Sequence, residues 1–284
     1  MFKDIKVNKR ILIILAVAVV FCTLGSATAP DTSLPSAEKA LQMLKEGNER
    51  FVTGKSSHPR MDAARLAETS KNGQRPFATI LTCSDSRLPA EIIFDTGIGD
   101  IFVIRVAGNV CDTDEAGTIE YGAGHLGTPL LVVMGHTGCG AVTAVATEAN
   151  VGGNIAPLVA NIKPAVAKAA ALNPHLNKEE LVPEAIKANC WQSIEDLLKS
   201  SEEARELVKT GKLQVVAAIY NISTGKVGWL GAHPEQSKLL AAFESSEKKE
   251  AAAEPGKGKE ITAGQTDEPK KDEPKKDEKS ESRH

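Results

Sequence analysis

Two short segments, Cys83–Arg87 (Cys-Ser-Asp-Ser-Arg) and His136–Gly140 (His-Thr-Gly-Cys-Gly), constrain the fold more than any other part of the sequence. Each follows an apolar run of strand length, 77–82 before the first and 130–134 before the second. Two strand ends therefore offer two thiols and one imidazole, which are preferred ligands of a borderline-soft divalent metal such as zinc. No other cysteine or histidine is spaced to complete a closed structural site. Three firm ligands and one open or contested position are typical of a catalytic metal.

Taken together, the two segments resemble the β class of carbonic anhydrases, zinc enzymes that hydrate carbon dioxide reversibly to bicarbonate. The likeness continues through 89–95 (Pro-Ala-Glu-Ile-Ile-Phe-Asp), 105–109 (Arg-Val-Ala-Gly-Asn) and 119–121 (Ile-Glu-Tyr), and it covers roughly residues 36–240. The resemblance implies Zn²⁺ as cofactor and CO₂ or bicarbonate as substrate. It also implies a homodimer or a dimer of dimers, because the pockets of the family lie at a subunit boundary.

The resemblance assigns Cys83, His136 and Cys139 to the metal and makes Asp85 and Arg87 a catalytic pair. Arg87 can hold the Asp85 carboxylate by two parallel hydrogen bonds, which keeps it ionised and directed at the nucleophile that zinc generates. In some relatives this ion pair breaks and the aspartate becomes the fourth zinc ligand, so Asp85 is also a metal ligand in a closed state.

Three further residues match positions that shape the substrate pocket in plant-type relatives. Gln74 would hydrogen-bond CO₂ or bicarbonate, while Phe102 and Tyr121 would form an apolar wall, contributed by the neighbouring subunit. The alternative is ordinary core packing for the two aromatic residues and a plain loop position for Gln74.

Two other functions remain open at this point. Related proteins use the same kind of zinc site to hydrolyse carbon disulfide or carbonyl sulfide. A non-catalytic zinc module, in which the metal only joins two strand ends, is the alternative from another class. The Asp85–Arg87 pair argues against that module, because a structural site has no use for a carboxylate at the fourth position.

One substituted position concerns regulation. Relatives that close their site at low pH have a non-catalytic bicarbonate pocket and a tryptophan three residues before the first cysteine ligand, where this chain has Ile80. Arg105 stands where a partner arginine would lie, but a single cation makes a poor anion pocket. We therefore expect an open site, with Asp85 held by Arg87 at neutral pH.

Strand-like and helix-like segments alternate along the central part of the chain. The predicted strands are 77–82, 101–106, 130–134 and 213–220, with a probable antiparallel edge at 226–230. The predicted helices are 36–51, 62–70, 115–126, 141–148 and a long helical region over 155–208. This alternation predicts an α/β fold with a central, mostly parallel sheet of four strands plus the edge strand, flanked by helices, with ligands at the strand ends.

The two ends of the chain differ in composition from the centre. Basic residues precede the apolar run 11–22 and small residues follow it, so residues 1–29 read as a secretory signal and predict an exported, periplasmic protein. After cleavage no membrane contact is expected, and an uncleaved membrane anchor is the minor alternative. Residues 30–243 form the predicted catalytic domain. The charged, nearly apolar-free stretch 244–284 is predicted to be a disordered tail.

Composition excludes nucleic acid as a partner. The net charge is −3 and only 4% of residues are aromatic, so neither a basic surface nor a base-stacking platform is indicated. A literal G-x-G-x-x-G at 122–127 precedes a strand, whereas the dinucleotide-binding loop follows one, so that motif is rejected. Cys111 and Cys190 are interpreted as two separate buried thiols, with a disulfide as the alternative.

Overall fold

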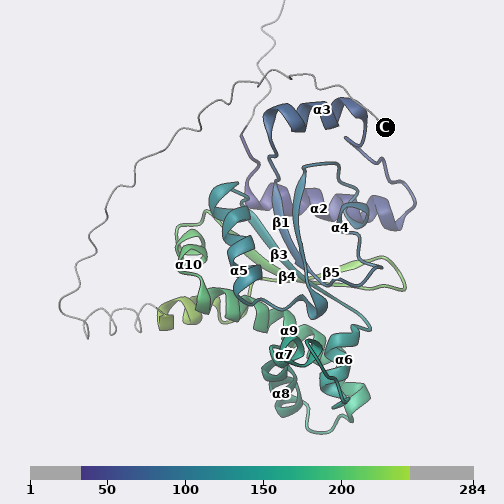
Figure 1. Ribbon diagram of the computed structural model, residues 1–284, viewed down its shortest axis with the longest axis vertical. Coiled ribbons are helices and arrows are strands. Elements are labelled where there is room, and N and C mark those ends of the chain that lie inside the picture. The colour runs from purple at the N-terminus through teal and green to yellow at the C-terminus, as the bar shows by residue number, and fades with distance from the viewer. Residues whose placement is uncertain (1–32, 244–284) are drawn as a thin grey trace, which may run out of the picture. The chain divides into compact units, whose positions relative to one another are not determined.

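The computed structural model describes residues 33–243, and its central element is a five-stranded sheet with the order β2-β1-β3-β4-β5 (Figure 1). The first four strands are mutually parallel and β5 runs antiparallel to β4. This confirms the predicted α/β fold and its edge strand. The predicted signal segment 1–29 and the tail 244–284 lie outside the described residues. The strands are β1 (Ala78–Thr82), β2 (Ile101–Arg105), β3 (Leu130–His136), β4 (Gln214–Tyr220) and β5 (Val227–Gly231).

The two central strands that lead to the ligands are buried along their whole length. Every residue of β1 and of β3 is buried, as expected for parallel strands covered on both faces. The register places Thr82 of β1 opposite Met134 of β3, so both strands end at the same edge of the sheet. Ligand residues that are about fifty positions apart in sequence are thereby brought together.

Nine α-helices and two short helical turns lie among the described residues, and the helical region predicted over 155–208 is divided into four of them. The last two of these four helices begin at residues 178 and 202, because the side chains of Asn177 and Ser201 cap them. The helices are α2 (Ala37–Val52), α3 (Ala63–Asn72), α4 (Ala90–Ile93), α5 (Thr113–Glu120), α6 (Gly140–Ala146), α7 (Ile155–Ala160), α8 (Lys163–Leu172), α9 (Lys178–Ser200) and α10 (Glu202–Lys209), and the turns are η1 (Ala107–Asn109) and η2 (Tyr121–His125).

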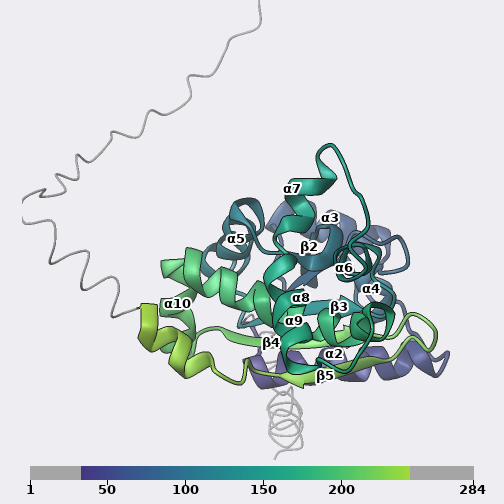
Figure 2. The same ribbon diagram turned by 90° about the horizontal axis from the view of Figure 1, so that it is seen from below.

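Two helices fix the sheet. The long helix α9 packs on β3 and β4. Helix α2 lies beside β5, as Figures 1 and 2 both show, and its buried Asn48 accepts a hydrogen bond from the backbone N–H of Val227 at 2.9 Å. Ser36 caps α2 and Asp62 caps α3, each by accepting a hydrogen bond from a backbone N–H.

The helix predicted over 115–126 changes its winding after Glu120. Helix α5 continues into η2, a single π-helical turn in which the rejected glycine motif begins. A side chain at Gly122 would come within 2.5 Å of Thr79 Oγ1 and 2.9 Å of Phe102 Cδ1. Only glycine therefore allows this turn to lie directly against β2.

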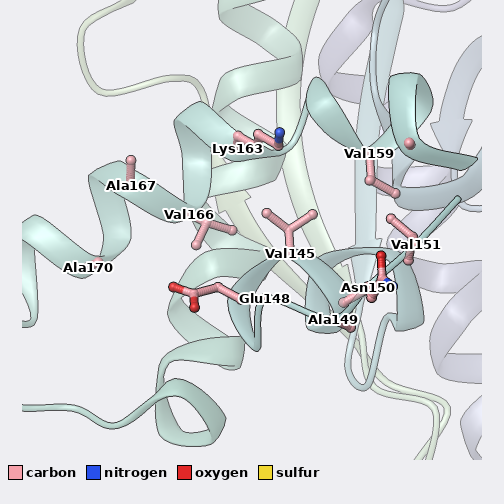
Figure 3. Close-up of a pocket in the computed structure, with 12 residues that line it drawn as sticks. Val145, Glu148, Ala149, Asn150, Val151, Val159, Lys163, Val166, Ala167 and Ala170 are labelled. Atoms are coloured by element: carbon pink, nitrogen blue, oxygen red, sulfur yellow. The ribbon is translucent and has the colours of Figure 1, made fainter.

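An apolar groove of about 710 Å³ lies between α6, α7 and α8 and includes none of the predicted site residues. Val145 and Val166 point toward each other across it in Figure 3, with Glu148 and Lys163 among the residues that line it. The stretch Ile155–Leu172 beside it has a mean hydropathy of 1.3 over 18 residues, enough by length and composition to cross a membrane. One such stretch is weak evidence for a span, and here it is divided between α7 and α8.

Candidate metal centre

The three predicted ligands meet at the carboxyl edge of the sheet. Cys83 follows β1 directly, His136 is the last residue of β3, and Cys139 precedes the first residue of α6. One sulfur or nitrogen atom from each lies within 4.8 Å of the others, and all three side chains are buried. The sequence prediction that these residues lie together is confirmed.

The imidazole of His136 is oriented by the chain that follows it. Its Nδ1 lies 3.1 Å from the backbone carbonyl of Thr137, which assigns the proton to Nδ1. Thr137 is in turn fixed by the backbone N–H of Ile222, which donates to Thr137 Oγ1 at 3.2 Å. Nε2 is buried and has no hydrogen-bond partner among residues 33–243, so its lone pair is free for a metal.

The two thiols interact directly. The interaction with Cys139 lowers the pKa of Cys83, and the same interaction raises the pKa of Cys139. Loss of one proton from the pair is thereby favoured, and the thiolate is the form in which cysteine binds metals. Two sulfurs, one aligned imidazole nitrogen and a position left open fit zinc.

Asp85 lies beside this cluster and is held by Arg87. The Nε and Nη2 atoms of Arg87 donate to the two carboxylate oxygens at 2.9 and 2.7 Å. The side-chain hydrogen bond from Arg87 keeps the pKa of Asp85 well below its usual range. Asp85 Oδ2 lies 4.0 Å from His136 Nε2, so an ionised carboxylate borders the position that a metal would take.

The backbone around Cys83 and Asp85 is held by Arg105. The Nε atom of Arg105 donates to the carbonyl of Cys83 at 3.2 Å, and its Nη2 donates to the carbonyl of Asp85. The guanidinium is thus occupied in fixing the ligand loop. On the other side, the backbone N–H of Gly108 donates to Cys83 Sγ at 3.3 Å.

The three predicted substrate residues lie at the opposite end of the sheet. Gln74 precedes β1, while Phe102 near the start of β2 stands in register with Thr79. Phe102 and Tyr121 do meet, with ring centroids 5.9 Å apart. A five-residue strand spans roughly 16 Å, so these residues do not share a pocket with the metal ligands of the same chain.

Comparisons with known proteins agree with this geometry. A family model described as carbonic anhydrase matches residues 78–227, more than half of the chain. Carbonic anhydrase 2 of Mycobacterium tuberculosis is 38% identical over 201 residues, which cover 69% of this chain and 93% of that protein. The chain belongs to the carbonic anhydrase family. A carbonic anhydrase of Mycolicibacterium smegmatis is 34% identical and is covered to 94% of its length.

The solved structures identify the class. The β-carbonic anhydrase CafA of Aspergillus fumigatus is 28% identical and superposes with a TM-score of 0.58, covering 73% of this chain and 98% of that one. The fold and the family together place this chain among the β-class carbonic anhydrases. The chain is therefore an enzyme of the carbonic anhydrase type. A purely structural metal module is the weaker interpretation.

Several supporting residues were not predicted from the sequence. The role of Gly108 as a donor to Cys83 was missed, although the Arg-Val-Ala-Gly-Asn segment contained it. Asn189 and Ser193 of α9 reach the same turn, and their only signal was two polar residues one helical turn apart on an otherwise apolar helix face.

Proposed function

We propose that this β-class carbonic anhydrase binds one Zn²⁺ through Cys83, His136 and Cys139 and catalyses the reversible hydration of CO₂ to bicarbonate and a proton. The observation that carries the proposal is the buried thiol–imidazole–thiol cluster with its atoms within 4.8 Å, bordered by the ionised Asp85. Zinc held there would acidify a water molecule and so supply the nucleophile for attack on the carbon of CO₂.

The remaining steps are assigned to the side chains of the protein. Asp85 stays ionised because Arg87 donates to both of its oxygens, so it offers a hydrogen-bond acceptor to the nucleophile and cannot itself hold a proton at neutral pH. His136 donates from Nδ1 to the carbonyl of Thr137, an orientation that presents Nε2 to the metal. Arg87 thereby acts on the reaction through the orientation of Asp85.

We further propose that the pocket is completed by a second copy of the chain. Gln74, Phe102 and Tyr121 lie at the end of the sheet away from the ligands, so a neighbouring subunit must supply them if they contact substrate. An even-numbered assembly meets this requirement. Two β-carbonic anhydrases of Sordaria macrospora that share the fold are described as tetrameric, which supports the proposal.

The decisive experiment combines metal analysis with stopped-flow CO₂ hydration of the purified protein. We expect one zinc per chain, and loss of both zinc and activity in Cys83→Ala and His136→Ala. Cys111→Ser is the matched control, because Cys111 is a buried free thiol outside the cluster, and it should retain both. Full zinc occupancy in Cys83→Ala would refute the assignment of the ligands, and zinc-loaded protein without CO₂ hydration would refute the reaction.

A further inference from the structure

The turn η1, which joins β2 to α5, carries an N–H group that donates to Cys83, a predicted zinc ligand. Gly108 N lies 3.3 Å from Cys83 Sγ, and the contact is buried. Hydrogen bonds to a ligating atom from groups that do not touch the metal orient that ligand and tune its electron donation. The position of η1 therefore bears on the metal site.

The backbone of η1 is in a left-handed conformation. Gly108 has a φ of 75° and Asn109 a φ of 45°, so two successive residues adopt the left-handed region. A Cβ at Gly108 would come within 2.7 Å of Ile162 Cδ1, so the turn is also closely packed. Glycine and asparagine adopt this region readily, so the exact position of the turn depends on the contacts around it.

Two side chains of α9 supply those contacts. Asn189 Nδ2 donates to the carbonyl of Gly108 at 2.6 Å, and Ser193 Oγ donates to the carbonyl of Asn109 at 2.8 Å. The two residues are one helical turn apart on the same face, and they are only 1% and 2% exposed. Each thus fixes one carbonyl of the turn, and the Gly108 N–H, which directly precedes these two carbonyls along the backbone, donates to the sulfur.

We propose that Asn189 and Ser193 are positioning residues for the zinc centre, because they hold the Gly108 N–H against the Cys83 sulfur. This inference rests on the proposed zinc function and adds to it a support for one ligand from a helix more than eighty residues further along the chain. The hydrogen bond orients the Cys83 sulfur toward the other two ligands. It also withdraws charge from the thiolate, which sets how strongly that ligand donates to the metal.

The test measures metal binding and the electronic state of the site, not turnover. The zinc dissociation constant is obtained by competition with a chromophoric chelator, and the thiolate-to-metal charge-transfer band is recorded after substitution with Co²⁺. For Asn189→Ala we expect zinc affinity to fall about 10- to 100-fold and the cobalt band to shift. Ser193→Ala should show a smaller change in the same direction, and Ser193→Thr, which keeps the hydroxyl, should restore the wild-type values.

The matched control is Gln192→Ala. Gln192 is a buried amide of the same helix, but it donates to Asp196 and not to η1. The Gln192→Ala variant should keep the wild-type zinc affinity and cobalt band, even if its thermal stability falls by as much as that of the Asn189→Ala variant. Wild-type affinity and an unshifted cobalt band in Asn189→Ala would overturn the inference.

Two further outcomes are decided by the same measurements. If Asn189→Ala does not fold, the Ser193→Ala and Ser193→Thr pair decides, because equal bands in those two variants would also overturn it. Failure of the wild-type protein to bind zinc would instead remove the proposed function, and the inference with it.

Discussion

Arg87 donates three hydrogen bonds to one carboxylate, from its backbone N–H at 3.0 Å and from two guanidinium nitrogens at 2.9 and 2.7 Å. The backbone bond would survive replacement of the side chain, but the planar grip on both oxygens would not. We therefore expect Arg87→Ala to retain zinc and to lose about 100-fold or more in kcat, since misplacing a reacting group costs at least that much. Stopped-flow kinetics with parallel zinc analysis checks this.

Arg87→Lys is the informative companion variant. An ammonium group keeps the positive charge but cannot bind both oxygens in one plane, so only partial recovery is expected. Near-normal turnover of Arg87→Ala would remove the pair from the mechanism, and loss of zinc in that variant would show that its role is structural.

The same contact bears on the pH profile. Because the hydrogen bond from Arg87 lowers the pKa of Asp85, this group stays ionised far into acid and does not limit activity near neutrality. With Ile80 in place of the tryptophan of the closing relatives, we expect kcat/KM to fall on acidification with the slope of a single proton. A steep loss of kcat/KM at about pH 8 that involves several protons, or cooperative inhibition by bicarbonate, would contradict this expectation.

At this scale the sequence was sufficient where a ligand directly follows an apolar run. Cys83 and His136 could be placed because the ends of neighbouring parallel strands meet at one edge of the sheet. Gly108 and Asn189 could not be paired in the same way, because they are 81 positions apart and no periodicity in the sequence connects them. Contacts of that kind depend on how α9 lies on the sheet.

At the scale of elements, Asp95 fastens the segment after α2 to the end of α4. Its carboxylate accepts hydrogen bonds from the backbone N–H of His58 at 2.8 Å and of Ser57 at 3.0 Å, and from Arg50 Nε at 2.6 Å. Asp95 itself has a φ of 46°, which asparagine tolerates as well as aspartate does. Asp95→Asn therefore tests the charge without a change of backbone preference.

The effect of that substitution should depend on pH. Burial acts to raise the pKa of Asp95, but hydrogen bonds from Ser57 and Arg50 outweigh it and lower the value to about 2. A carboxyl with a lowered pKa in the folded state adds stability above its unfolded pKa of about 3.9, and this stability is lost as the pH falls toward about 2. We expect Asp95→Asn to lower the free energy of unfolding by about 2 kcal/mol at pH 7.

Urea denaturation of the zinc-free proteins measures this difference, which should narrow to about half near pH 3. Glu68→Gln is the control, because that carboxylate is 57% exposed and its i,i+3 pair with Arg65 is worth little. If the difference in the free energy of unfolding between wild type and Asp95→Asn were the same at pH 7 and pH 3, its cause would be a change in packing or hydrogen bonding and not the loss of charge.

Elements were predictable where an apolar period or a buried run marked them, as the apolar spacing over 36–51 marked α2. The π-helical turn η2 was not, because it lies close to Thr79 and Phe102 at Gly122, a tertiary contact that no local period in the sequence shows. The short helix α4 was also missed, since four residues are too few to show a helical period.

At the scale of the whole molecule, the proposed division of the pocket between two chains can be tested by mixing inactive variants. Cys83→Ala removes one of the three proposed metal ligands, and a Gln74→Ala, Tyr121→Ala double variant removes the opposite wall. If each pocket needs both halves, unfolding and refolding the two variants together should restore about a quarter of wild-type activity per chain. One composite site in each mixed pair then has both halves intact.

The control is the same mixture without unfolding, in which subunits have not exchanged. Activity that stays at the level of the separate variants after exchange would contradict a shared pocket. Substantial activity of the double variant alone would instead remove Gln74 and Tyr121 from substrate binding.

The order of the strands has a consequence for how the protein reaches its folded state. Strands β1 and β3, which carry the ligands, need only the first half of the domain, whereas β4, which covers the other edge of β3, begins at residue 214. Pairing of strands that are far apart in sequence is slow, because the intervening loop must lose conformational entropy before the stabilising contacts form. The half-formed sheet therefore presents the bare edge of β3 and two unprotected sulfurs while the rest of the chain arrives. We therefore expect the protein to be most vulnerable to oxidation and to edge-to-edge association in the interval between forming its ligand site and enclosing it.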